Sequence, residues 1–190
     1  MQIPQKSNFE RTAFGVLIAC FFCIAFLHAA DSAHNPELGD FPSIQVTSLD
    51  GAKLYLPKDF SGELNLVVIS FAREQQQEVD TWIPLAQQMQ SAHNNFSYYE
   101  LPTASRENLL YRWWLDSSLR SNTTDKTLRA RTLTAYVNKH RFQKKLSIAN
   151  DKRIVALLVT QTGKILWRTD GACTGAAKLG LQSALAANGE

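Results

Sequence analysis

Thiol chemistry is the first possibility raised by the reactive side chains of this sequence, because three cysteines occur among its 190 residues. Cys20 and Cys23 lie inside a strongly apolar N-terminal segment, which leaves Cys173 as the one cysteine of the remaining chain. Thiol–disulfide exchange needs a thiolate nucleophile and a second thiol that resolves the mixed disulfide. A lone cysteine supplies neither that pair nor an internal disulfide.

Metal binding is not predicted either. A structural zinc site needs four ligands, and one cysteine cannot be the core of a cysteine-rich set. His34, His93 and His140 stand far apart, without the short spacing of ligand pairs. The sequence therefore implies no metal and no other cofactor.

Cys173 supports one enzymatic alternative. It lies in Gly171-Ala172-Cys173-Thr174, just before the predicted closing helix, where a helix dipole can lower the pKa of a thiol. A single-thiol oxidoreductase or a peroxiredoxin-like enzyme is the function that such a cysteine would serve. The other interpretation is a small apolar residue packed under the start of a helix.

The charge of the chain is nearly balanced but unevenly distributed. The formal net charge is +3, which argues against nucleic-acid binding, because neutralising many phosphates needs a larger basic excess. Residues 31–111 carry eleven acidic and four basic residues, whereas 120–153 carry ten basic and two acidic ones. The basic stretch is either a solvated helical surface or a contact for an acidic partner or anionic lipid.

Residues 13–30 form an apolar segment that follows Lys6 and Arg11 and precedes a polar stretch over 31–40. This order predicts a signal peptide or a membrane anchor, followed by a linker. Eighteen helical residues span about 27 Å, close to the hydrocarbon thickness of a bilayer, and a small-x-small cleavage site is missing, which favours the anchor. We expect an exported domain, anchored in the inner membrane and facing the periplasm, or periplasmic if the segment is cleaved. Lipidation at Cys20 and a mitochondrial inner-membrane location are the alternatives.

The remaining chain, 41–190, has enough apolar residues for one domain of α/β class. Alternating residues over 44–47 and 53–56 flank Asp50-Gly51, which predicts a hairpin with a tight turn. The continuous apolar core of 64–71 predicts a central strand that is buried on both faces.

A helix over 74–90 is predicted next, with Pro84 either kinking it or lying where no backbone donor is needed. A strand over 96–101 follows and is bounded by Pro102. We then expect a polar helical stretch and a later helix whose apolar side repeats Leu128, Ala135, Phe142 and Leu146.

The end of the chain predicts a hairpin and a helix. The apolar runs over 154–160 and 164–168 are joined by a turn at Gly163, a residue that tolerates left-handed geometry. The closing helix places apolar residues at helical spacing, at Ala177, Leu181, Ala184 and Leu185.

This order of elements resembles the thioredoxin-like fold, and within it the redoxin branch. Phe41-Pro42, Leu49-Asp50-Gly51 and residues 66–71 look like the corresponding parts of membrane-anchored thioredoxins and peroxiredoxins. The resemblance implies a central mixed sheet with flanking helices, an N-terminal β-hairpin and a helical insertion before the last hairpin. One apolar helix would precede this domain.

The resemblance also locates the redox loop. Counting five residues on from Phe71 puts the first cysteine of such a loop at Gln76, and counting back from Pro84 puts the second at Val79. Gln76-Gln77-Glu78-Val79 therefore stands where a Cys-x-x-Cys motif would lie. The cis-proline of redox-active relatives is also missing, because that place holds Asp151-Lys152-Arg153-Ile154.

A narrower resemblance, over about 119–185, is to the mitochondrial ATP synthase assembly factor family. It is carried by spaced residues that include Tyr136, Asn150, Gly171 and the run Ile165-Leu166-Trp167-Arg168. Members of that family have a thioredoxin-like fold, mostly lack the active cysteines and help to assemble the membrane sector of the synthase. The resemblance implies an assembly factor or chaperone for a membrane protein complex, with its subunits as partners.

Candidate partner contacts follow from these placements. Arg73, Glu74 and Gln76 would lie at the rim of the former redox site, a surface that binds peptides in redox-active relatives. Trp113 and Trp114 are adjacent on a predicted helix and point about 100° apart, so that one of them is either an exposed anchor or a further core residue.

Overall fold

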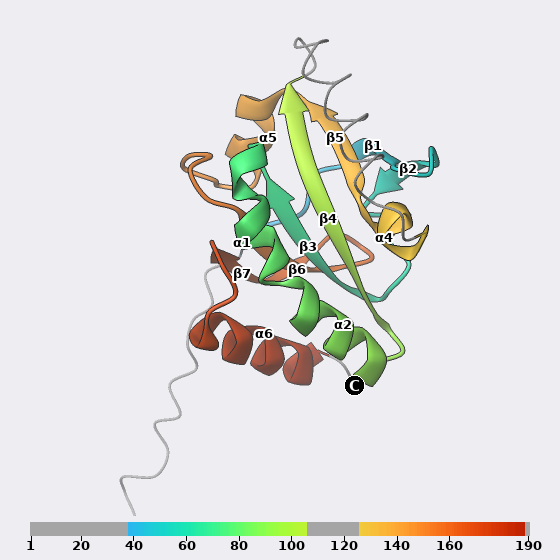
Figure 1. Cartoon of the computed structure of the whole chain (residues 1–190), viewed down its shortest axis with the longest axis vertical. Helices are drawn as coiled ribbons and strands as arrows, with labels where there is room; N and C mark the ends of the chain where they lie inside the picture. Colours follow the sequence, from blue (N-terminus) through green and yellow to red (C-terminus); the bar gives the residue numbers. More distant parts are fainter. Residues whose placement is uncertain (1–37, 106–125, 189–190) are drawn as a thin grey trace, which may run out of the picture. The chain divides into compact units, whose positions relative to one another are not determined.

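The computed structural model describes residues 38–105 and 126–188, and Figure 1 shows that they form a twisted sheet flanked by helices. All of them belong to one compact unit, Glu37–Glu190. Its strands are β1 (Ile44–Ser48), β2 (Lys53–Leu56), β3 (Leu64–Ser70), β4 (Phe96–Ser105), β5 (Leu133–Val137), β6 (Val155–Thr160) and β7 (Ile165–Asp170). Its helices are η1 (Arg73–Gln75), α1 (Gln76–Asp80), α2 (Ile83–Ala92), α4 (Lys126–Arg131), α5 (Lys139–Lys145) and α6 (Gly175–Asn188).

The seven strands form one mixed sheet in the order β2-β1-β5-β4-β3-β6-β7. β4 is parallel to both β3 and β5, and the other neighbouring pairs are antiparallel. All seven residues of β3 are buried, because layers of side chains cover both of its faces. The predicted central strand and the predicted α/β class are thereby confirmed.

Both predicted hairpins are present. β1 and β2 pair antiparallel around Gly51, whose φ of +98° supplies the left-handed backbone that the turn needs. β6 and β7 pair around Gly163, with a φ of +100°. The chain before β1 joins the same sheet: Gly39 and Asp40, in the predicted linker, lie beside the start of β7, and the Ile165 N–H donates to the Gly39 carbonyl at 3.1 Å.

The helix predicted over 74–90 is divided into three pieces. η1 runs directly into α1, which ends at Asp80. α2 begins at Ile83, after a junction at Thr81 and Trp82. Pro84 lies in the first turn of α2, where a backbone N–H has no partner within the helix. Of the two expectations for Pro84, the position without a needed donor is the one found.

β4 does not end at Pro102, as the sequence predicted, but continues to Ser105. The Thr103 hydroxyl donates to the Ser70 carbonyl at 2.9 Å, a side-chain bond across the ends of β3 and β4. The residues after Pro102 also pair with β5, so a neighbouring strand stabilises them. The extension gives the sheet a longer parallel ladder beside the candidate site.

The prediction of one late helix, made from the spacing of Leu128, Ala135, Phe142 and Leu146, is wrong. The segment forms α4, then strand β5, then α5. Ala135 lies in β5, which fits between β1 and β4 and is almost wholly buried. The Asn138 side chain accepts the Arg141 N–H at 2.9 Å and so caps a new helix, a signal that the spacing of apolar residues concealed. The predicted helical insertion therefore contributes a strand to the sheet.

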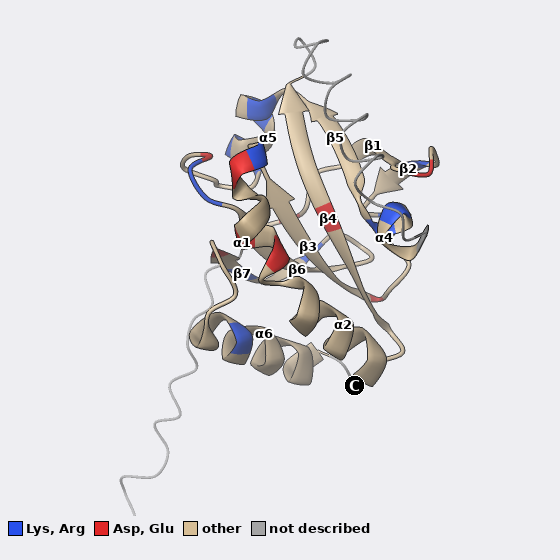
Figure 2. Cartoon of the chain, in the orientation of Figure 1, with Lys and Arg blue, Asp and Glu red and all other residues tan. Residues whose placement is uncertain are grey.

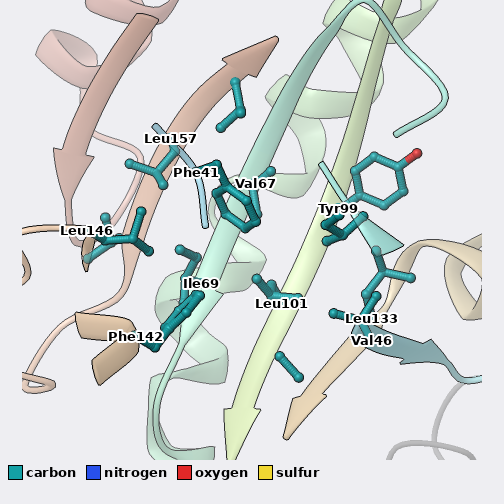
Figure 3. Packing of buried hydrophobic residues seen from close by; sticks show 14 of the residues in the cluster. Phe41, Val46, Val67, Ile69, Tyr99, Leu101, Leu133, Phe142, Leu146 and Leu157 are labelled. Carbon is teal, nitrogen blue, oxygen red and sulfur yellow. The ribbon is translucent and has the colours of Figure 1, made fainter. Parts of the chain in front are cut away.

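The hydrophobic core consists of two layers, one on each face of the sheet. Val79 of α1 and buried residues of α2 and α6 cover one face, where Trp82 is fully buried. Phe142 of α5 packs on the other face with Phe41 from the segment before β1. Figure 3 shows the Phe142 ring beside Ile69 of β3 in this second layer. The predicted apolar faces of 74–90 and of the closing helix are confirmed as core.

Candidate functional site

The segment aligned with a redox motif lies at the carboxyl end of the central strand. β3 ends at Ser70, η1 follows, and Gln76 to Val79 are the first four residues of α1. The loop over 151–154 leads into β6 and the loop over 171–174 follows β7, and both meet α1 at this edge of the sheet. The segment picked out by the count between Phe71 and Pro84 thus lies at the edge of the sheet where these loops meet.

None of the four side chains at this place carries sulfur. Gln76 and Gln77 are exposed, and the Gln76 amide donates to the Asp80 carboxylate at 2.9 Å. Val79 is only 2% exposed and belongs to the core under α2. An amide and a buried isopropyl group cannot act as nucleophile and resolving group in thiol exchange.

Gln75, which the sequence did not single out, is the side chain that organises the loop. Its Oε1 accepts the N–H groups of Phe71 at 2.8 Å and Ala72 at 3.3 Å, and its Nε2 donates to the Asp151 carbonyl at 2.7 Å. The Gln75 side chain is buried, and its bond to the Phe71 N–H is buried with it, whereas the bonds to Ala72 and Asp151 are partly buried. Its position in a run of three glutamines offered no signal of this role.

Glu78 makes a second connection between α1 and the loop where a cis-proline would stand. Its Oε2 accepts the Ile154 N–H at 3.4 Å, and its Oε1 lies 3.7 Å from Nε of Arg153. The Arg153 guanidinium in turn covers Gly171, where an added Cβ would lie 1.8 Å from Nη2. Gln75 and Glu78 thus both contact the loop over 151–154.

The junction between α1 and α2 is tied to the loop after β7. The indole N–H of Trp82 donates to the Gly171 carbonyl at 3.0 Å, and the Trp82 ring meets Trp167 edge to face at 6.0 Å. The Thr81 hydroxyl accepts the Cys173 N–H at 2.9 Å. Cys173 therefore lies at the far end of α1, close to the former redox position.

The environment of Cys173 does not activate its thiol. The side chain is partly buried, and this burial raises the pKa of the Cys173 thiol above its ordinary value, with a smaller opposing effect from Lys178. Of the two interpretations that the sequence left open for Cys173, the raised pKa favours the small, partly buried residue over the activated thiol, because desolvation outweighs the nearby positive charge. Less thiolate is present at neutral pH than for a free cysteine.

A partly buried carboxyl group lies beneath α1. β4 carries one acidic residue, Glu100, which is drawn red in the middle of the strand in Figure 2. Burial raises the pKa of Glu100, the Asp80 charge raises it further, and a hydrogen bond with Gln76 opposes the shift. The sequence contained no sign of this arrangement, because Glu100 and Gln76 come together only when β4 aligns beside β3.

The other sequence-predicted residues are distributed as follows. Arg73 and Glu74 are exposed on η1, at the rim of the site, and Gln76 is exposed beside them. Trp113 and Trp114 lie outside the described residues. Within 38–105 and 126–188, no group of three His, Cys, Asp or Glu side chains is close enough to hold a metal ion.

The predicted membrane segment, 13–30, also lies outside the part of the chain that the structure describes. Among the helices that are described, none is both long and apolar enough to span a bilayer.

Comparisons with solved structures show that the chain has a thioredoxin-like fold. A thiol:disulfide interchange protein from Bacteroides sp. is 17% identical, with a TM-score of 0.51 over 76% of this chain and 86% of that one. BsSco, a member of the Sco family of cytochrome c oxidase assembly proteins, is 16% identical, with a TM-score of 0.53 over 78% and 93%.

A third structure with this fold is the exposed lipoprotein thioredoxin of Streptococcus pneumoniae, which is 8% identical, with a TM-score of 0.54 over 77% of this chain and 99% of that one. No family model matches the sequence, and no curated protein matches it significantly. Since the identities are low, these likenesses concern the fold and leave the role of the site to its own geometry.

Proposed function

We propose that this chain is a membrane-tethered thioredoxin-fold protein that acts without redox chemistry, as an assembly factor or chaperone for a membrane protein complex. The observation that carries the proposal is the state of the former redox site. By the count from Phe71 and Pro84, Gln76 and Val79 would stand where the two thiols lie in redox-active relatives. Gln75 and Glu78 hold the facing loop by hydrogen bonds. A site without thiols can still bind a partner protein through its ordered surface.

The exposed side of the site is suited to contacts rather than to chemistry. Arg73, Glu74, Gln76 and Gln77 present charged and amide groups on η1 and the first turn of α1. Beneath them the loop is held by buried hydrogen bonds, which keeps the surface ordered before a partner arrives. Arg73, Glu74 and Gln76 are therefore the residues that we assign to partner contact.

The nature of the partner is proposed from the N-terminal segment and the family resemblance. Residues 13–30 would hold the domain at the outer face of the inner membrane, beside subunits of membrane complexes. The resemblance to ATP synthase assembly factors makes a synthase-like complex the first candidate. BsSco supports the general idea, because it is a member of a family of cytochrome c oxidase assembly proteins and has the same fold.

The enzymatic alternative uses Cys173 as a single thiol. Its place beside Thr81, at the same edge of the sheet as α1, is the observation in its favour. Its raised pKa counts against it, since a catalytic cysteine needs a stable thiolate.

The test uses the full chain, carrying a C-terminal affinity tag and extracted from membranes with mild detergent. We expect subunits of one membrane complex to co-purify, and cells without the chain to contain less of that complex on native gels. Reintroducing the Cys173→Ser variant should restore assembly fully. Reduction of insulin or turnover of peroxide by the purified chain, abolished by Cys173→Ser, would overturn the proposal in favour of the enzyme.

A further inference from the structure

A pocket separate from the former redox site lies between α5 and the residues that lead into β1. Its volume is about 350 Å³, at the small end of the range for ligand pockets. Phe142, Ile44 and Pro42 supply apolar walls, and Asn138 adds a polar group at one side. Phe142 is buried, and its ring also meets Phe41 at 6.3 Å, so this wall is part of the hydrophobic core.

The charged residues that line the pocket are both cations. Arg141 and Lys145 are exposed side chains of α5, and no acidic residue is part of the lining. The described parts of the chain contain no carboxylate within ion-pair distance of either side chain. Arg141 and Lys145 therefore present two positive charges beside an apolar cavity.

The geometry of α5 explains why these two cations belong to the pocket. Residues four apart lie about 40° apart around a helix, so Arg141 and Lys145 share one side, next to the buried Phe142. Lys144 lies about 200° from Phe142 and points to solvent. Lys139 is engaged with Asp151, in an ion pair away from the pocket lining. Figure 2 shows basic residues on α5 in blue.

We infer that this pocket binds an acidic segment of a partner protein, in which a carboxylate side chain is close to an apolar one. The carboxylates pair with Arg141 and Lys145, and the apolar side chain enters the cavity against Phe142 and Ile44. The two positive charges favour an acidic residue of the partner segment. The apolar wall of the pocket favours an apolar residue next to it. A concave pocket can receive a side chain that protrudes from a partner protein. A bilayer presents a flat surface, which would not fill the pocket.

This inference goes beyond the proposed function and does not depend on it. The contact is made by α5 and the segment before β1, whereas the proposed function concerns η1 and α1. If the purified chain binds the peptide, this inference holds even if the protein proves to be an enzyme. If the chain does not bind the peptide, the proposed assembly function is unaffected.

The experiment measures fluorescence anisotropy of labelled peptides added to the full chain in detergent, at about 150 mM salt, where distant charges are screened. The probe is a ten-residue peptide in which Leu alternates with Glu, and the neutral control alternates Leu with Gln. We expect saturable binding of the acidic peptide that is at least about tenfold tighter than that of the control.

Two variants on the same helix localise the contact. The double charge reversal Arg141→Glu and Lys145→Glu should weaken binding of the acidic peptide by about tenfold or more. The matched change Lys144→Glu, on the solvent side of α5, should alter it by less than about twofold. All three residues are exposed, and equal unfolding midpoints in urea would show that the variants fold alike.

Three results would overturn the inference. Equal affinity for the neutral peptide would show that charge does not select the ligand. The double variant changes the net charge twice as much as Lys144→Glu, so a loss of binding free energy in Lys144→Glu about half that of the double variant would show a diffuse field rather than a pocket. Binding to phosphatidylglycerol vesicles without any binding to the acidic peptide would assign the basic surface to the membrane instead.

Discussion

The side chain of Gln75 and the backbone of Asp151 are joined by a hydrogen bond of 2.7 Å, although the two residues are 76 positions apart. The same amide accepts the N–H groups of Phe71 and Ala72. One buried side chain thus connects the end of the central strand with the loop before β6. Both segments lie at the edge of the sheet where α1 begins.

Replacing Gln75 with alanine should destabilise the fold by about 1–2 kcal/mol, because one buried and two partly buried backbone groups lose their partner together. The matched control Gln77→Ala removes an exposed amide from the next turn and should change stability by less than about 0.5 kcal/mol. Urea unfolding followed by tryptophan fluorescence measures both. Equal losses in the two variants would show that the Gln75 bonds do not stabilise the loop.

Gly171 should tolerate a side chain poorly. Its φ of +92° is rarely adopted by residues with a side chain, so Gly171→Ala is expected to cost about 1–3 kcal/mol, whereas the exposed Arg153 guanidinium nearby can move aside. Gly175→Ala is the control, since Gly175 begins α6 with open space around it and should lose less than about 0.5 kcal/mol. Thermal unfolding of the two variants gives the comparison, and a Gly171→Ala variant as stable as Gly175→Ala would contradict it.

Glu100 predicts a pH-dependent difference between wild type and Glu100→Gln. Because burial raises the Glu100 pKa in the folded state, folding favours the protonated acid, and its contribution is fully present below the ordinary value of 4.5. That contribution is lost as pH rises through the higher folded pKa. The stability of Glu100→Gln relative to wild type should therefore increase between about pH 4 and pH 7.

Urea midpoints measured across that pH range test the prediction, with Glu74→Gln as an exposed carboxylate control. A Glu100→Gln curve that runs parallel to that of wild type would show that Glu100 is no more protonated in the folded chain than in the unfolded one.

Cys173 should be alkylated slowly at neutral pH. In a background with Cys20→Ala and Cys23→Ala, the rate of reaction with iodoacetamide should rise with pH to a midpoint higher in the folded chain than in urea, because burial raises the pKa of this thiol. Stopped reactions analysed by mass spectrometry give the rates. A lower midpoint in the folded chain would instead support a reactive cysteine and the enzymatic alternative.

The sequence predicted well where short-range pattern and burial agree. The continuous apolar run of β3, the turns at Gly51 and Gly163 and the closing helix α6 were all recognised from neighbouring residues. Such signals are local, because a turn needs a left-handed residue and an amphipathic helix needs a regular apolar spacing.

The prediction from sequence was wrong where the structure of a segment depends on the strands that lie beside it. A helix was predicted from the spacing of Leu128, Ala135 and Phe142. Ala135 instead lies in β5, because that strand pairs with β1 on one side and with β4 on the other. Strand preference depends on such neighbours more than helix preference does. The connection from Gln75 to Asp151 and the pocket beside Arg141 likewise exist only after distant segments meet.

The amino-acid sequence by itself determined that no thiol pair stands at positions 76–79, since side-chain identity needs no folding to be known. It also determined a buried central strand, because apolar residues on both faces must leave water. Only the tertiary structure decided that Gln75 and Glu78 fasten the facing loop, that Cys173 is desolvated and that Arg141 and Lys145 flank a cavity. Those properties depend on the packing of segments far apart in the chain, where burial and charge act through space rather than along the sequence.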